Sequence, residues 1–148
     1  MQIPIQLFDI EGEGFHLMMQ GKINGMEALF LIDTGASRSV FDPTSITKFI
    51  EKPKFKRKKG TVCGLGGDKL KSTTFTIASL TLGDIELNNY EAVALDMQIV
   101  NKTYSKLGIP PIDGIIGSDI LYRLKATINY RLRKIRFTKP KSKAKPSK

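Results

Sequence analysis

The sequence predicts an all-β fold, a small barrel or sandwich of short strands with one or two short helices. Its apolar residues fall in short extended runs separated by Asn-Gly, glycine and proline turns, and only two segments begin with a helix-start signal. The 148 residues, of which 41% are hydrophobic and 26% charged, are enough for one soluble domain with a packed core. No apolar run reaches the roughly 18 residues that a membrane-spanning helix needs.

The first two strands are expected on either side of a tight turn. Residues 15–23 are an extended candidate, and Asn24 and Gly25 follow as a strong hairpin signal. Residues 26–33 (MEALFLID) return as a nearly continuous apolar run, which is typical of a strand covered on both faces. This second strand ends at an acidic residue, Asp33.

Two short helices are expected further along. Asp42 can cap a helix and Pro43 suits its first position, so we predict a helix that ends near Ile50. A very short apolar strand that begins at Ile112 leads into a second helix at residues 117–119. The buried side of this second helix would consist of Ile120, Leu121 and Leu124.

The remaining segments are predicted as hairpins and one loop. Residues 61–68 (TVCGLGGD) contain a glycine-rich turn that would form the tip of a long β-hairpin. A glycine turn then precedes a strand, or a bent strand pair, over residues 85–95. Residues 100–112 are expected to form an irregular loop, because glycine and two prolines break regular structure there. Residues 126–130 and 134–138 alternate as two closing strands.

The formal charge of +10 lies in two segments rather than in the body of the chain. Residues 52–59 and 139–148 together contribute eleven positive charges, so the remainder sums to about zero. We therefore divide the chain into an N-terminal segment (1–14), one domain (15–138) and a basic tail (139–148) that is expected to be disordered. Contact of the tail with nucleic acid or an anionic surface is the less favoured alternative.

A single cysteine, Cys63, and a single histidine, His16, exclude several classes of site. One cysteine cannot form an internal disulfide, and a histidine-based triad or a zinc site with several His or Cys ligands lacks its residues. A thiol mechanism is disfavoured, because no histidine lies near Cys63 in the sequence. We expect no metal and no cofactor. No secretory signal is visible, which favours a cytoplasmic location.

Two motifs carry the functional signal. Residues 31–37 read LIDTGAS, in which an acid, a hydroxyl and small residues follow a strongly apolar strand, and residues 113–117 read DGIIG. With the glycine-tipped hairpin between them, these motifs resemble those of the retropepsin-like (retroviral-type) aspartic protease family, in a cellular or bacterial single-domain form. The resemblance covers residues 15–138 and implies a retropepsin-like acid protease barrel with a β-hairpin flap.

The chemistry of such a site requires two carboxylates. Peptide hydrolysis without a metal or a covalent intermediate needs a base that activates water and an acid that protonates the scissile group. Two carboxylates about 3 Å apart can do both, because like charge prevents both from being ionised near neutral pH. The chain has one DTGA motif, so the second carboxylate must come from a second copy. A twofold homodimer would place Asp33 against its symmetry mate.

The resemblance implies roles for the residues of both motifs. Asp33 would be the catalytic acid and base, and Thr34 would brace the loop across the dimer through its hydroxyl. Gly35 would let the chain approach the carboxylates closely and leave its N–H free to contact them. Four residues would support the loop: Ala36 in a crowded turn, Ile115 and Ile116 packed behind it, and Gly117, where the chain turns into the helix.

The expected activity is that of an aspartic endopeptidase acting on an extended polypeptide. The flap would close over this substrate and exclude bulk water, and apolar pockets would set the specificity. The residues expected at the flap tip are Gly64, Leu65, Gly66 and Gly67.

Two serines depart from the viral pattern, which has an acid directly after DTGA and an arginine directly after the second glycine element. Here these places hold Ser37 and Ser118. The missing charge pair motivates an alternative, a non-catalytic peptide-binding or dimerisation module with the same fold. Asp113 could be a second carboxylate within one chain, but shaping a turn is the favoured role. Asp119 is expected to satisfy backbone N–H groups at a helix start.

Overall fold

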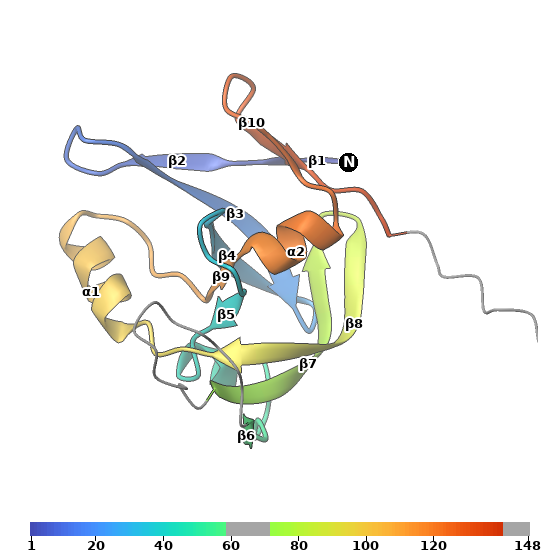
Figure 1. The fold of residues 1–148 in the computed structure, drawn as a ribbon. Coiled ribbons are helices and arrows are strands. Elements are labelled where there is room, and N and C mark those ends of the chain that lie inside the picture. The colour runs from blue at the N-terminus through green and yellow to red at the C-terminus, as the bar shows by residue number, and fades with distance from the viewer. Residues whose placement is uncertain (59–71, 141–148) are drawn as a thin grey trace, which may run out of the picture.

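The structure is a computed structural model that describes residues 1–58 and 72–140 (Figure 1). Its regular elements are mostly short strands, as expected: β1 (Gln2–Pro4), β2 (Gln6–Asp9), β3 (Phe15–Ile23), β4 (Met26–Ile32), β5 (Val40–Phe41), β6 (Lys56–Lys58), β7 (Ser72–Leu82), β8 (Ile85–Ala94), β9 (Gly114–Ile116), β10 (Thr127–Asn129) and β11 (Lys134–Arg136). The helices of this described part are α1 (Gln98–Lys106), α2 (Ser118–Arg123) and a single 3₁₀ turn, η1 (Ser45–Lys48).

The strands confirm the expected barrel. One sheet has the order β2-β3-β4-β9-β5-β8-β7-β6, and an additional pairing of β3 with β7 closes six of these strands into a ring. The barrel interior is filled by the larger apolar cluster, in which Phe41 makes edge-to-face contacts with Phe30, Phe75 and Tyr90 at 6.0, 6.4 and 6.0 Å between ring centroids. Strand β9 lies parallel to β4 inside this ring, which places the two motifs side by side.

The first hairpin forms where the Asn-Gly signal predicted it. Asn24 and Gly25 both have positive φ, 50° and 79°, as a tight hairpin turn between twisted strands requires. The register pairs Ile23 with Met26 and Leu17 with Ile32. The Asn24 side chain also accepts the N–H of Ser79 at 3.0 Å, so the turn is anchored to β7 as well. This register fixes where β4 ends, and therefore where Asp33 lies.

A second, smaller apolar cluster lies on the outer face of β3, β4 and β9 and is covered by α1. This helix replaces the irregular loop that we expected over residues 100–112. Val100 and Tyr104, four residues apart, both pack into the cluster, and tertiary burial of this face stabilises the helix. The Asn101 amide joins α1 to the following chain, because it accepts the N–H of Ile112 at 2.8 Å and donates to its carbonyl at 3.1 Å. The glycine and prolines act only after the helix has ended.

The helix expected from Asp42 to Ile50 is only one 3₁₀ turn, η1. Asp42 was expected to cap this helix, but the cap residue is Thr44, and the Asp42 carboxylate accepts the N–H of Thr44 itself at 3.2 Å. Helix α2 begins at Ser118 as predicted, and Ile120, Leu121 and Leu124 are all buried.

Residues 1–14 contribute two strands that pair with the rest of the chain. Strand β1 joins β11 and β10 in a three-stranded sheet, and β2 pairs with β3. Ile3 and Ile5 are buried in the main core. The N-terminal residues therefore pack as part of the folded body.

Several expectations fall on residues outside the described ranges. The antiparallel pair β6–β7, with Lys56 opposite Thr74, borders residues 59–71, so Cys63 and the expected flap tip lie outside the described part. Residues 141–148 of the basic tail lie outside it too. Among the residues that are described, no helix is long and apolar enough to cross a membrane.

Candidate active site

Asp33 follows directly after β4, on the face of the sheet opposite the barrel core. Phe30 and Ile32 point into the core, so the alternation along the strand turns Leu31 and Asp33 to the other side. The backbone continues the pairing with β9 for one further residue, since the Asp33 N–H donates to the carbonyl of Ile116 at 3.0 Å. Asp33 is half-buried, and its position is fixed by two strands from distant parts of the sequence.

The residues after Asp33 form a tight turn around its carboxylate. The Gly35 N–H donates to Asp33 Oδ1 at 3.0 Å, and the Ala36 N–H donates to the Asp33 carbonyl at 3.2 Å. Thr34 and Gly35 are exposed. A Cβ on Gly35 would have Asp33 Oδ1, at 3.3 Å, as its one near neighbour in the described chain. This distance is a tight contact, so the chain passes close to the carboxylate at Gly35.

Gly117 holds the turn from behind. A Cβ at this position would lie 2.7 Å from the Ala36 carbonyl oxygen and 2.8 Å from that of Arg38, both backbone atoms. Only glycine lets the chain pass this closely. The following N–H, that of Ser118, donates to the Ala36 carbonyl at 2.7 Å. The second motif is thus in direct contact with the first, as the sequence predicted.

Ser39 and Asp119 form a brace that the sequence did not reveal. The Asp119 carboxylate accepts the backbone N–H of Ser39 at 2.9 Å and its hydroxyl at 2.7 Å. The Gly117 N–H in turn donates to Ser39 Oγ at 2.8 Å. Asp119 was expected to satisfy N–H groups at the start of its own helix, but it binds the loop after Asp33 instead. Only the folded proximity of the two motifs makes Ser39 its partner.

Tyr90 extends this brace to strand β8. Its hydroxyl lies 3.5 Å from Asp119 Oδ2. Burial, followed by the negative charge of Asp119, raises the pKa of Tyr90 to about 12. The phenol therefore stays protonated at any pH at which a peptidase is commonly assayed, and it can donate to the carboxylate.

The Asp113 carboxylate makes contacts that stabilise the fold. Its carboxylate accepts the Leu29 N–H at 2.9 Å and the Ser45 hydroxyl, and it lies 3.6 Å from Lys48 Nζ. These contacts tie η1 and β9 to β4. They agree with the structural role that the sequence favoured for Asp113, although the bound N–H belongs to β4 rather than to a local turn.

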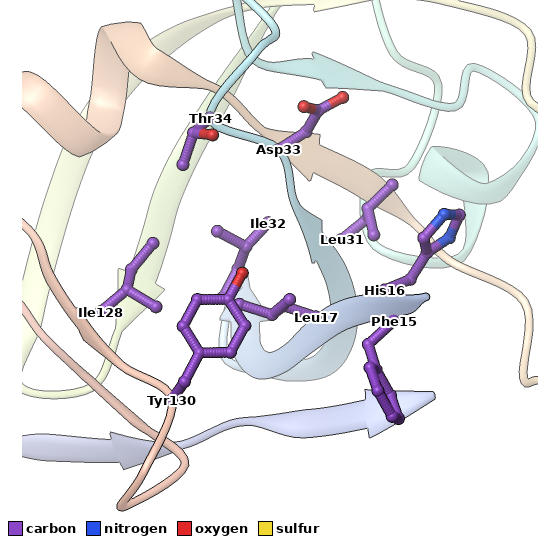
Figure 2. A pocket seen from close by; sticks show the side chains of 9 residues that line it. All are labelled: Phe15, His16, Leu17, Leu31, Ile32, Asp33, Thr34, Ile128 and Tyr130. Atoms are coloured by element: carbon purple, nitrogen blue, oxygen red, sulfur yellow. The ribbon is translucent and has the colours of Figure 1, made fainter. Parts of the chain in front are cut away.

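A cavity of about 270 Å³ opens beside Asp33 (Figure 2). One wall is apolar and comes from β3, β4 and the C-terminal hairpin: Leu17, Ile32, Ile128 and Tyr130. The other side carries Leu31 and His16, with Leu31 drawn between His16 and Asp33. Asp33 is the one acidic residue among the residues that line this cavity. Sequence reasoning missed Ile128 and Tyr130, because no motif marks the closing hairpin as part of the site.

His16, on the Leu31 side of the cavity, is hydrogen-bonded to Tyr104. Its Nδ1 lies 2.7 Å from the hydroxyl of Tyr104 on α1, and the two rings meet edge to face at 5.6 Å. Burial, and then the charge of Asp33, raise the pKa of Tyr104. His16 is thus a strand residue whose ring is hydrogen-bonded through Nδ1. In the described ranges, no three His, Cys, Asp or Glu side chains gather where they could hold a metal ion.

Residues 19–120 match the family described as Aspartyl protease. The chain belongs to the aspartyl protease family. The matched region contains Asp33 and both motifs, and it ends before β10 and β11. No match was found among the curated proteins.

Two of the solved structures that match share the retropepsin-like fold of this chain. A retropepsin-like aspartic protease from Rickettsia conorii is 20% identical, with 93% of this chain and 89% of that chain covered and a TM-score of 0.55. The retroviral protease-like domain of Ddi1 from Leishmania major is 17% identical, with 82% and 87% covered and a TM-score of 0.52. At these identities the likeness is one of fold, so the chemistry must be argued from the site.

Proposed function

We propose that this aspartyl protease is an endopeptidase that works as a homodimer, with Asp33 of each chain supplying one carboxylate. The observation that carries the proposal is the contrast between three aspartates near the two motifs. Asp113 and Asp119 are occupied by contacts that hold the fold, whereas Asp33 faces the cavity and, among the residues that the structure describes, receives a single N–H, from Gly35. One chain therefore offers one carboxylate for chemistry, and a dyad needs two.

In the dimer the two Asp33 groups would share one proton. The ionised carboxylate takes a proton from water, and the resulting hydroxide attacks the scissile carbonyl carbon. The protonated carboxylate gives its proton to the carbonyl oxygen, which yields a gem-diol intermediate. As the C–N bond breaks, the other carboxylate passes the proton that it took from water to the departing amide nitrogen, and the first carboxylate takes a proton back from a gem-diol hydroxyl. The pair titrates as a unit, so its two apparent pKa values belong to the dyad and not to either chain.

The exposed surface around Asp33 suits the approach of a second chain. Thr34 and Gly35, on the outer side of the turn, are exposed, so the Thr34 hydroxyl is free to brace the partner's loop. Ile116 is buried behind the turn and Ile115 is half-buried, so the support comes from within each chain. The flap residues Gly64, Leu65, Gly66 and Gly67 would cover an extended polypeptide from the end of the β6–β7 pair.

The test is Asp33→Asn, which keeps an oxygen for the Gly35 N–H and removes the ionisable group. Cleavage of a degenerate peptide library, followed by mass spectrometry between about pH 3 and pH 8, should fall by several orders of magnitude. The melting temperature should stay unchanged. Asp84→Asn, the same change at an exposed turn between β7 and β8, is the matched control and should cleave like the parent chain. Full activity of Asp33→Asn would overturn the proposal.

The alternative is a peptide-binding or dimerisation module without catalysis. It is favoured by the positions that carry the charge pair in viral members, because Ser37 is exposed and Ser118 contributes only its N–H to the Ala36 carbonyl. A dimer that binds library peptides and cleaves none of them over the same pH range would establish this alternative.

A further inference from the structure

The cavity wall beside Asp33 carries one polar side chain that the proposed chemistry does not use, that of His16. The strand register defines its place. Met18 pairs with Leu31 and Leu17 with Ile32, where the pairing of the two strands ends, so continuing this register by one residue would set His16 opposite Asp33. Side chains opposite each other in an antiparallel pair lie on the same face. His16, Leu31 and Asp33 therefore share one face, and Figure 2 shows Leu31 between the other two.

Tyr104 fixes the orientation of the imidazole. Its ring is buried beneath β3 and its hydroxyl lies 2.7 Å from His16 Nδ1. Burial, and then the charge of Asp33, raise the pKa of Tyr104, so its hydroxyl keeps its proton. This hydroxyl can donate to Nδ1 or accept from it, and in the tautomer in which it donates, the imidazole hydrogen is on Nε2. Within the described residues, no hydrogen-bond acceptor is assigned to Nε2, and His16 lines the cavity.

We propose that His16 determines specificity by donating its Nε2–H to the substrate side chain that lies over Leu31, next to the scissile bond. The inference rests on the proposed function. The preferred side chain would carry an uncharged acceptor, the amide oxygen of Gln or Asn. A wholly apolar side chain of similar length would leave the Nε2–H without a partner once water is excluded, and such unmade bonds are costly. A carboxylate would meet the negative charge of the Asp33 dyad.

This inference differs from the expectation that apolar pockets alone set the specificity. The Leu17, Ile32, Ile128 and Tyr130 wall fits an apolar side chain, but the Leu31 side of the cavity combines an apolar floor with a fixed donor at its end. A purely structural histidine would affect stability when replaced, and it would leave the ranking of substrates unchanged. The two roles therefore give different results in a specificity measurement.

The experiment compares kcat/KM at about pH 7 for peptides that differ only by Gln or Met. The exchange is made in turn directly before and directly after the scissile bond. One of the two positions should favour Gln by about tenfold in the parent chain. His16→Phe keeps a ring and removes the donor, so the ratio should fall to one or below. His16→Gln keeps a donor and should restore part of the preference.

Tyr104→Phe provides a second variant that removes only the hydroxyl that orients the ring. It should reduce the Gln-to-Met ratio while the melting temperature shows that the chain still folds. Equal ratios in the parent chain, or an unchanged ratio in both His16→Phe and Tyr104→Phe, would overturn the inference and leave the proposed function intact.

Binding of the same peptides to the Asp33→Asn chain, measured by calorimetry, separates the inference from catalysis. If the parent chain cleaves nothing, a Gln preference in Kd that His16→Phe abolishes still supports the recognition, and equal Kd values overturn it.

Discussion

Three aspartates near the ends of β4 and β9 differ in what surrounds them, and this difference divides their roles. The Asp119 carboxylate binds two donors of Ser39, and that of Asp113 binds Leu29, Ser45 and Lys48. Within residues 1–58 and 72–140, the Asp33 carboxylate binds one N–H, and it faces a cavity. A motif search finds Asp33 from its neighbours in sequence, whereas the roles of the other two depend on residues about 70 to 80 positions away. Such long-range partners are invisible in a single sequence.

Tyr90 provides a prediction at this scale, because its pKa is raised from 10.0 to about 12 in the folded chain. In the unfolded chain the phenol loses its proton near pH 10, whereas the folded chain keeps it until about pH 12. The folded state therefore binds more protons between these values, and the free energy of unfolding falls as pH rises from about 10 to 12. The contribution is fully present below pH 10 and amounts to at most about 3 kcal/mol.

Tyr90→Phe removes this titration. Urea unfolding at about pH 9, 10, 11 and 12 should show that the free energy of unfolding declines less steeply in the variant than in the parent chain. Other groups that titrate in this range contribute equally to the free energy of unfolding of both chains, so their contributions cancel in the difference between the variant and the parent chain. Parallel declines in both chains would show that Tyr90 ionises alike in the folded and unfolded states.

At the scale of elements, the site is built where β4, β9 and α2 meet. The parallel pairing of β4 with β9 brings the two motifs together, and α2 begins where Gly117 passes the carbonyl groups of the Asp33 loop. Helix α1 covers the outer face of these strands and supplies Tyr104 beneath His16. The turn that follows Asp33 is therefore supported on the side that faces the molecule and is open on the other.

Gly117→Ala tests this junction. The added methyl group would lie 2.7 and 2.8 Å from two backbone oxygens, so the loop after Asp33 must move. We expect a loss of about 1 to 3 kcal/mol in stability and a larger proportional loss of cleavage, because the carboxylate shifts with the loop. Gly14→Ala is the matched control, since a Cβ there meets nothing within 4 Å. Equal melting temperatures and rates for the two variants would contradict the close approach.

The elements also show which parts of the fold the sequence could predict. The Asn24-Gly25 hairpin and the start of α2 follow from local chemistry, and both appear where expected. Helix α1 was missed because its breakers follow it closely and its stability comes from packing against β3 and β4. The strands of residues 1–14 were missed because each is short and forms only by pairing with a distant partner. Local signals predicted the motif-bearing elements, and tertiary contacts determined the rest.

At the scale of the whole molecule, the proposed site is incomplete in one chain. The described residues place one carboxylate at the cavity, and the exposed turn at Thr34 and Gly35 offers the side from which a second chain can approach. Activity should therefore fall faster than protein concentration on dilution, because the dimer dissociates and each free chain holds half a dyad. If each chain carried a complete site, activity would fall only in proportion to the protein concentration.

A mixed-chain experiment separates these two cases without any knowledge of the dimer geometry. The parent chain is refolded together with an equal amount of Asp33→Asn, so that chains pair at random. About a quarter of the dimers then contain two intact chains, and the activity per intact chain should fall to about half. Refolding with an equal amount of the unrelated variant Asp84→Asn keeps two intact carboxylates in every dimer and should leave activity per chain unchanged. If Asp33→Asn also leaves the activity per intact chain unchanged, each chain works alone, and a second carboxylate must then be sought within the same chain.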